Sequence, residues 1–325
     1  MNTIGRIFSF TDFGESHGVA VGGVVDGCPA GLKLDMAQIR SELQRRAGKD
    51  LPYGVSMRAK TEEDQVCWLS GIKDDITLGS PIAFFIKNQS THAEDYEKIK
   101  NIFRPAHADF TYQAKYGIRD WRGGGRASAR ETAARVVAGS IAKQLLAKYN
   151  ISVNAKVIQI GDEIDRNRFA DILKDLQEKG DSIGGIVECV IHGMKIGIGE
   201  PIFDKLPARL SYFIMSINAC KGFEYGSGFS LVNKRGSEIN NMSGGALGGI
   251  SDGTDFTFRC VFKPTPSISI AQRTIDENGK SVDISIRGRH DVCLALRAPV
   301  IVESMAAITI ADLLLENISR SCYAK

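Results

Sequence analysis

The chain has 325 residues, of which 43% are hydrophobic, and its 41 basic and 38 acidic residues nearly balance. This balance gives no reason to expect nucleic acid or an anionic membrane as a partner over the whole surface. Seven cysteines, scattered and never in C-x-x-C spacing, argue against a disulfide framework and a zinc site and fit a reducing cytoplasm. No linker divides residues 1–325, so one large domain is expected. The N-terminus lacks an apolar signal core, and no later apolar run stands out as long enough to span a bilayer, which predicts a soluble cytoplasmic protein.

Two strands are expected between Ile4 and Val25, on either side of a polar loop, Asp12-Phe-Gly-Glu-Ser-His-Gly. Apolar residues alternate with period two on both sides of this loop. The loop presents Ser16 and His17 between glycines, as catalytic loops on rigid scaffolds often do. A hydrogen-bonded turn is the simpler interpretation of this loop taken alone.

A first helix is expected after Asp35, which is a good N-cap residue, and it ends at Gly48. Arg46 lies in the last turn of this helix. A cation there complements the helix dipole, so a ligand role for Arg46 needs support from elsewhere.

The stretch Ile102-Phe-Arg-Pro-Ala-His-Ala-Asp brings together Arg104, His107 and Asp109. Pro105 holds the backbone extended before any helix begins. A cation, a proton carrier and a carboxylate therefore lie close together along the chain. An ordinary hydrogen-bonded surface network is the alternative, although the whole chain has only five histidines.

A glycine- and arginine-rich stretch, residues 119–135, leads into the central helix. Its three consecutive glycines, Gly123–Gly125, let backbone amides approach a ligand closely. Ser128 and Glu131 have the S-x-x-E spacing of a capping box that starts a helix. Three arginines add full charges to the positive end of that helix: Arg122, Arg126 and Arg130. The stretch favours anion binding, but a flexible loop before a capped helix explains it equally well.

The other apolar patterns predict further strands and helices. An alanine-rich helix over 128–149 has apolar residues on more than one side, which indicates burial between two layers. Strands are expected at 66–69, 81–86, 151–160, 186–191, 256–262 and 282–286. Further helices are expected at 168–179, 207–217 and 300–318.

Three later stretches gather groups suited to a ligand. Ser216-Ile-Asn-Ala and Lys263-Pro-Thr-Pro-Ser offer an amide, a cation and hydroxyls. Arg287-Gly-Arg-His-Asp offers cations, a histidine and a carboxylate. The glycine-dense run 244–253 permits close approach of a flat ligand, although turns and bulges explain glycines about as often. The sequence contains neither a P-loop nor a dinucleotide fingerprint after a strand.

Six motifs resemble those of the chorismate synthase family, in the family's order: Gly14-Glu-Ser-His-Gly, Phe103-Arg-Pro-Ala-His-Ala-Asp, Arg122-Gly-Gly-Gly-Arg-Ala-Ser-Ala-Arg-Glu-Thr, Ser216-Ile-Asn-Ala, Lys263-Pro-Thr-Pro-Ser and Gly288-Arg-His-Asp. The resemblance covers nearly the whole chain. It implies an α+β fold, namely a β-α-β sandwich with a central helical layer between two antiparallel sheets, assembled as a homotetramer. It also implies a cytoplasmic lyase of the shikimate pathway. That enzyme eliminates phosphate from 5-enolpyruvylshikimate 3-phosphate in a 1,4-anti sense to give chorismate, and it uses reduced FMN.

The resemblance further implies roles for single residues. His17 matches the histidine that protonates the departing phosphate, and His107 matches the one that protonates the reduced flavin. Asp291 matches the carboxylate that helps the flavin to remove the C6 proton, and Ser16 is expected to assist that relay. Arg46 matches an arginine on the substrate or NADP side of the site.

Twelve positions match the family's FMN site and supply helix-end amides, hydroxyls and cations for the flavin phosphate and ring. They are Arg126, Ala127, Ser128, Asn218, Ala219, Gly248, Lys263, Pro264, Thr265, Pro266, Ser267 and Arg289. Because no dinucleotide fingerprint is present, the reduced FMN is expected to come from an external reductant.

Three of the chain's departures from the family pattern bear on whether it is an active enzyme. Ala127 stands where the family usually has a serine, Asn241-Met242 stands where it has Asn-His, and no second arginine follows Arg46 in the stretch 49–57. The alternative interpretation is therefore a catalytically impaired paralogue that binds flavin or anions. The presence of both matching histidines and the matching carboxylate favours the enzyme. An RNA-binding module is disfavoured, because no stacking aromatic residues are interleaved with the arginines.

Overall fold

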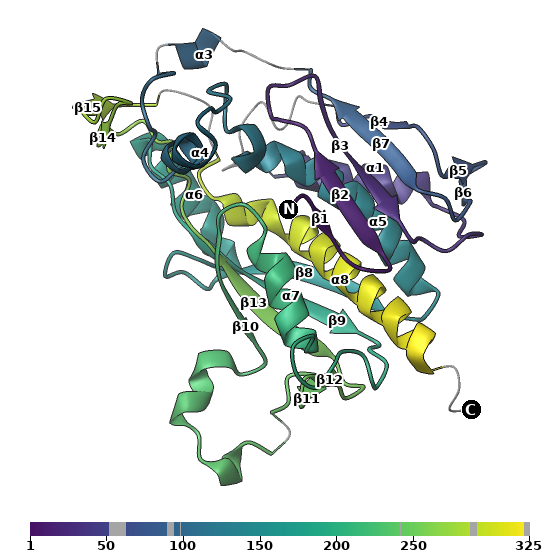
Figure 1. Ribbon diagram of the computed structural model, residues 1–325. Helices are drawn as coiled ribbons and strands as arrows, with labels where there is room; N and C mark the ends of the chain where they lie inside the picture. The colour runs from purple at the N-terminus through teal and green to yellow at the C-terminus, as the bar shows by residue number, and fades with distance from the viewer. Residues whose placement is uncertain (52–62, 90–93, 98, 241, 287–290, 322–325) are drawn as a thin grey trace.

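The computed structural model describes residues 1–51, 63–89, 94–97, 99–240, 242–286 and 291–321. The structure mixes helices and sheets, so the predicted α+β class is confirmed (Figure 1). The strands are β1 Thr3–Ile4, β2 Ser9–Phe13, β3 Ala20–Asp26, β4 Val66–Trp68, β5 Ile72–Lys73, β6 Ile76–Thr77, β7 Ile82–Lys87, β8 Ser152–Ile160, β9 Gly185–His192, β10 Cys220–Tyr225, β11 Ala246–Leu247, β12 Ile250–Ser251, β13 Phe256–Phe262, β14 Gln272–Ile275 and β15 Ser281–Ile284. The α-helices are α1 Met36–Ala47, α3 Glu94–Glu97, α4 Asp109–Tyr116, α5 Thr132–Ala147, α6 Phe169–Lys179, α7 Leu206–Met215 and α8 Ala298–Ser321. The 3₁₀ helices are η1 Gly125–Ala127, η2 Ala129–Glu131, η3 Arg166–Arg168, η4 Gly228–Asn233, η5 Gly236–Glu238 and η6 Leu294–Leu296.

Two antiparallel sheets form most of the β structure. One has the strand order β1-β2-β3-β7-β4 and the other the order β10-β13-β9-β8. Val66 pairs with Ile86, which confirms the hairpin predicted from 66–69 and 81–86, although the short β5–β6 ribbon is inserted between its strands. Strand β10 was not predicted, because Gly222 interrupts its apolar pattern. In the structure, a bulge between Cys220 and Gly222 interrupts its pairing with β13.

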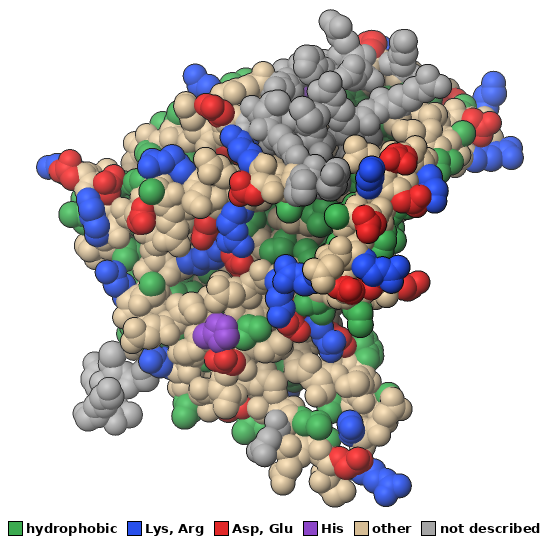
Figure 2. Space-filling view, turned by 180° about the vertical axis from the view of Figure 1, so that it is seen from behind, with side chains coloured by type: hydrophobic (Ala, Val, Ile, Leu, Met, Phe, Trp, Pro, Cys, Tyr) green, Lys and Arg blue, Asp and Glu red, His purple; other side chains and the backbone are tan. Residues whose placement is uncertain are grey.

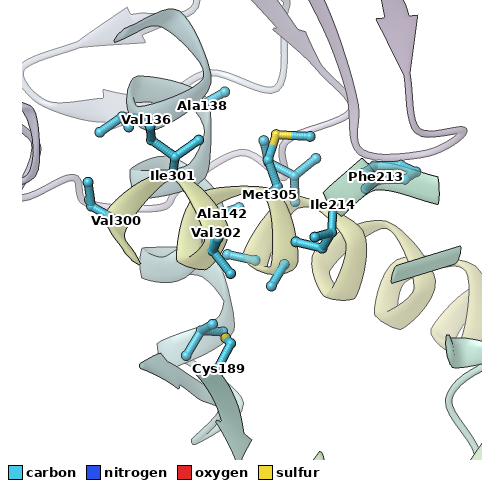
Figure 3. Close-up of a cluster of buried hydrophobic side chains, with 14 of the residues drawn as sticks. Val136, Ala138, Ala142, Cys189, Phe213, Ile214, Val300, Ile301, Val302 and Met305 are labelled. Atoms are coloured by element: carbon cyan, nitrogen blue, oxygen red, sulfur yellow. The ribbon is translucent and has the colours of Figure 1, made fainter. Parts of the chain in front are cut away.

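Helices α5 and α8 lie between the two sheets in Figure 1 and pack closely along each other. Helix α5 contacts β2, β3 and β7 of the first sheet, whereas α8 contacts β8 and β9 of the second. A side chain at Gly139 of α5 would place its Cβ 2.2 Å from the Cβ of Ser304 on α8, so the glycine allows this close approach. The predicted burial of the alanine-rich helix is confirmed, and its side chains join those of α7, α8 and β9 in one hydrophobic core (Figure 3).

Helix α8 corrects the expectation that no apolar run is long enough to span a bilayer. Its stretch Ala298–Arg320 has the length and mean hydropathy of a membrane span. However, 89% of its most apolar window is buried inside the fold. The apolar composition is therefore explained by packing against α5, α7 and the second sheet.

The central helix begins later than the sequence predicts. Instead of starting at Ser128, it starts at Thr132, because η1 and η2 occupy the preceding turns. The Ser128 side chain does cap η2, since its Oγ accepts a hydrogen bond from the Arg130 amide at 3.3 Å. The Glu131 carboxylate pairs with Arg135 at 2.7 Å. The structure thus confirms the serine half of the predicted capping box. The Glu131 side chain pairs with Arg135 instead.

Candidate active site

The loop between β2 and β3 holds Ser16 and His17 in a buried arrangement. Gly14 has a φ of +98°, and a Cβ there would lie 2.2 Å from the carbonyl oxygen of Ala20, so only glycine fits this tight connection. His17 is 6% exposed and Ser16 is 2% exposed. The hydroxyl of Ser16 lies 3.0 Å from Nδ1 of His17, which fixes the ring. The loop therefore presents an oriented imidazole.

The triple glycine packs directly against this histidine. Gly123 has a φ of +62°, and a Cβ on it would lie 2.4 Å from Nδ1 and Cε1 of the His17 ring. The amide of Ser16 donates to the carbonyl oxygen of Gly125 at 3.3 Å. One reason for glycine in this stretch is therefore contact with His17, a role that the sequence alone does not reveal.

The three arginines of this stretch have protein partners. Arg122 pairs with Asp120 at 2.9 Å. Arg126 contacts the carboxylate of Asp12 at 3.2 Å and donates to the carbonyl oxygen of Gly14 at 2.9 Å. Arg126 thereby joins η1 to the loop that carries His17. Its guanidinium is one-quarter exposed, so it still faces the surrounding space.

Arg104 links the triple glycine to the His107 loop. It makes two hydrogen bonds of 2.7 Å to the carboxylate of Asp109 and a third of 2.7 Å to the carbonyl oxygen of Gly123. Burial would raise the pKa of Asp109, but the hydrogen bonds and charge of Arg104 lower it below its ordinary value. The Arg104 guanidinium also lies over the ring of Tyr96, which contacts His17 edge to face. Arg104 therefore holds the two histidine loops together.

His107 is presented by strained backbone. The preceding residue, Ala106, has a φ of +53°, in the left-handed region that disfavours residues with a Cβ. Lys263 donates to the carbonyl oxygen of Ala106 at 2.6 Å, and the Nε2 atom of His107 lies 2.6 Å from the hydroxyl of Ser267. Burial, followed by the nearby charge of Lys221, lowers the pKa of Lys263 below its ordinary value. Lys263 and Ser267, at the two ends of the Lys-Pro-Thr-Pro-Ser segment, thus fix the backbone before His107 and the His107 ring.

Most of the positions matched to FMN lie side by side. The side-chain amide of Asn218 donates to the carbonyl oxygen of Ala127 at 3.0 Å, and the amide of Lys263 donates to the carbonyl oxygen of Ala219 at 3.0 Å. Residues 126–128, 218–219 and 263–267 therefore form one connected group. The Oδ1 atom of Asn218 is buried and has no hydrogen-bond partner among the described residues.

Asp291 joins the same group from the other side. Its carbonyl oxygen accepts a hydrogen bond of 2.6 Å from the hydroxyl of Thr265, and its carboxylate accepts one of 2.7 Å from Arg297. Arg297 also donates to the carbonyl oxygen of Arg46 at 2.7 Å. One guanidinium therefore connects the predicted proton acceptor to the end of helix α1.

Arg46 and Arg130 share one buried carboxylate. Arg46 lies 3.2 Å and Arg130 lies 2.5 Å from the oxygens of Asp64, and all three side chains are at most 5% exposed. Burial would raise the pKa of Asp64, but the charges of Arg46 and Arg130 lower it. The two arginines are thus held side by side on one carboxylate. Asp64 and Arg297 were not predicted as site residues, because their importance depends on contacts between distant segments.

Gly248 is a predicted FMN position that lies away from this group. Gly248 lies in the β11–β12 turn, where the neighbouring Gly249 accepts a 2.7 Å hydrogen bond from the amide of Leu206 at the start of α7. Asn218 follows the other end of this 10-residue helix, about 15 Å along its axis. Arg289 lies outside the described residues, as does Asn241 of the altered Asn-Met pair.

A cavity of about 1030 Å³ opens beside the loops that carry His17 and His107. It lies between the His17 loop, helix α4 and the triple glycine, and its lining includes Arg104, His107, Gly124 and Arg126. A cavity of this size admits a cofactor or a drug-sized molecule. With fixed cations, two histidines and a carboxylate close by, the arrangement is suited to proton transfer on an anionic ligand. On the face seen in Figure 2, cationic and anionic side chains are interspersed.

Comparisons with known proteins agree with this picture. A family model described as chorismate synthase matches residues 8–315. A chorismate synthase of Christiangramia forsetii is 47% identical over 351 aligned residues, which cover 97% of this chain and 98% of the relative. A chorismate synthase of Azobacteroides pseudotrichonymphae is 44% identical over 357 aligned residues, which cover 98% of this chain and all of the relative. A crystal structure of a chorismate synthase is similar with a TM-score of 0.75 at 28% identity, covering 96% of this chain and 93% of that one.

Proposed function

The chain belongs to the chorismate synthase family, and we propose that it performs the family's reaction with reduced FMN held beside His107. In this reaction, phosphate is eliminated from 5-enolpyruvylshikimate 3-phosphate to give chorismate. The observation that carries this proposal is the contact between segments far apart in the sequence. His17 packs on Gly123, Arg104 joins Gly123 to the His107 loop, and Ser267 contacts His107. The groups needed for proton transfer are therefore assembled in one region.

The described residues fit a flavin. Arg126 and Lys263 supply cations and Ser128 and Ser267 supply hydroxyls, which suit a phosphate and ring oxygens. The buried Oδ1 atom of Asn218, without a partner among the residues that the structure describes, is an acceptor for a ring N–H. When bound, reduced FMN supplies an electron transiently and recovers it, so the reaction has no net redox change. Arg289 is a further proposed contact.

The chain's own residues divide the proton transfers. His17, oriented through Nδ1 by Ser16, protonates the departing phosphate. His107 donates a proton on the flavin side, and its contact with Ser267 sets the direction of the ring. Asp291 is the acceptor that helps to remove the C6 proton, and its ion pair with Arg297 orients the carboxylate. Ser16 assists this relay.

Arg46 and Arg130 provide the fixed positive charge for the anionic substrate. Both are buried and face the same carboxylate, Asp64, so their geometry is set before the substrate arrives. Preorganised cations of this kind stabilise the negative charge that develops on a leaving phosphate. This arrangement supports a substrate-side role for Arg46.

The same proposal extends to the assembly and location of the protein. The two sheets with helices between them support the three-layer β-α-β sandwich, acting as a single domain in the cytoplasm with FMN reduced by an external reductant. A homotetramer is supported by exposed apolar side chains on and near α7, including Tyr212, Met215, Phe229 and Val232.

Anaerobic turnover tests the proposed function directly. With 5-enolpyruvylshikimate 3-phosphate and photoreduced FMN, we expect release of phosphate and formation of chorismate, and no turnover with oxidised FMN alone. Phosphate release at the background rate, together with normal FMN binding, would instead indicate the impaired flavin-binding paralogue.

Lys263→Met is expected to weaken FMN binding by about 10- to 100-fold, because a charge-assisted hydrogen bond contributes about 1.5–3 kcal/mol. A fluorescence titration of FMN measures the change. Lys221→Met is the matched control, since Lys221 is exposed and near enough to influence the pKa of Lys263. Equal weakening in both variants would show a general effect of charge and reject a contact from Lys263.

A further inference from the structure

Two acidic side chains, Asp12 and Glu131, meet in the interior where β2 approaches the start of α5. They are 7% and 2% exposed. The Oδ2 atom of Asp12 and the Oε1 atom of Glu131 have no hydrogen-bond donor among the described residues. Both carboxyl groups contact the guanidinium of Arg135, which places the two acids side by side. Two ionised carboxylates only accept hydrogen bonds, so this contact is favourable only when a proton lies between them.

The charged groups around this pair come from three elements. Arg135, one turn along α5, contacts Glu131 at 2.7 Å and Asp12 at 3.8 Å. Arg126 of η1 contacts Asp12 at 3.2 Å, and Tyr112 of α4 faces the pair from the cavity side. Burial, opposed by the charge of Arg135 and reinforced by the contact with Asp12, raises the pKa of Glu131 to about 8. Both carboxyl groups thus share the guanidinium of Arg135, which lies closer to Glu131 than to Asp12.

We propose that Glu131 and Asp12 share one proton, and that this hydrogen bond positions the loop carrying Ser16 and His17. The role in positioning rests on the proposed function of His17. Asp12 lies near the end of β2, two residues before the tight turn at Gly14, and its main chain and that of Gly14 both accept hydrogen bonds from Arg126. Glu131 is anchored at the start of the central helix. The shared proton therefore ties a catalytic loop to the most buried part of the fold.

This arrangement has a definite pH dependence. The folded-state pKa of Glu131, about 8, is above the ordinary value of 4.5. The stability that the proton contributes is therefore fully present below pH 4.5, decreases as the pH rises, and is lost once the pH passes through about 8. Above that pH the two carboxylates repel each other, and the loop loses this contact. Turnover should decrease with the same midpoint.

Three variants test the proposal. Glu131→Gln keeps the shape, accepts from Arg135 and donates to Asp12 without a titratable proton. We expect it to retain turnover within about threefold and to remove the decrease near pH 8 from the profiles of kcat and Tm. Glu131→Ala should lower kcat by about 10²-fold at constant FMN affinity, because the loop loses its anchor. Asp12→Asn should also remove the decrease near pH 8, because the amide donates to ionised Glu131.

Infrared difference spectroscopy supplies a readout independent of catalysis. A protonated carboxyl group absorbs at a different infrared frequency from an ionised carboxylate. Wild type at pH 7 should therefore show a band that disappears above pH 9 and is missing in Glu131→Gln. If wild type lacks this band, or Glu131→Gln retains it, the shared proton is refuted. If the band behaves as expected but Glu131→Gln shows the same alkaline decrease in kcat as wild type, the role in positioning is refuted. Absence of turnover in wild type itself, with the band behaving as expected, would refute the proposed function alone.

Discussion

Replacing Gly123 by alanine is expected to lower kcat by about 10²-fold or more while leaving the fold intact. The new Cβ would lie 2.4 Å from two atoms of the His17 ring and 2.9 Å from the hydroxyl of Ser16. Because His17 is buried and held by Ser16, the ring cannot keep its position. A shift of about 1 Å in a catalytic group is enough to reduce turnover by about 10²-fold.

The control for this change is Gly125→Ala. Gly125 also has a left-handed backbone, with a φ of +51°, so alanine introduces a similar backbone strain of about 1–2 kcal/mol. A Cβ there meets no atom closer than 3.9 Å. The two variants should therefore show similar losses in Tm but very different values of kcat under anaerobic turnover. Similar losses of turnover in both would mean that backbone strain, and not contact with His17, explains the effect.

This comparison also shows what the triple glycine contributes. The motif indicates an anion-binding loop, and the loop contacts other positions that match the family's FMN site, such as Asn218. However, Arg122, Arg126 and Arg130 each have a protein carboxylate as partner. The loop is therefore preorganised by its own ion pairs, and its glycines make room for a histidine from a different segment. A ligand that binds here meets cations whose directions are already fixed, which reduces the reorganisation required.

Local signals in the sequence were sufficient for most of the secondary structure. Helix α1 begins after the Asp35 cap, whose carboxylate accepts from the amides of Ala37 and Gln38, and it ends at Gly48 with a φ of +67°, as capping chemistry predicts. Strand β13 was predicted residue for residue, since its apolar side chains alternate in a short run. Helix α4 was missed, because it is short and leaves Phe110 and Tyr116 exposed, so it lacks an apolar periodicity.

The candidate site could be predicted only in pieces. The motifs identify Ser16, His17 and His107, but nothing in the local sequence reveals that Arg104 connects their loops through Gly123. The same holds for Asp64 and Arg297. Each is an ordinary charged residue in its own segment and becomes informative only when the fold brings distant partners to it. Long-range ion pairs of this kind leave no periodic signal.

His107→Ala is expected to lower kcat by about 10²- to 10⁴-fold while changing FMN affinity by less than about tenfold. A positioned proton donor contributes on this scale to the rate. Its contact with the flavin side is one of several, since the cations and hydroxyls of the group remain in place. The measurements are anaerobic turnover with photoreduced FMN and a separate titration of FMN. His192→Ala is the matched control, because His192 is half-exposed and pairs with Asp255 at the end of β9, away from these motifs.

A second substitution separates proton transfer from positioning at the same place. His107→Gln retains a polar group that can reach the hydroxyl of Ser267, which now lies 2.6 Å from Nε2 of the ring. The amide does not donate a proton at neutral pH, so this variant should be as inactive as His107→Ala although its structure is less disturbed. If glutamine restores turnover, then His107 supports the Lys263–Ser267 segment and transfers no proton. If both variants lose FMN affinity in proportion to kcat, the residue acts in binding. Only a loss of kcat at constant affinity in both variants agrees with a proton donor, because such a group acts on the transition state and not on the bound ground state.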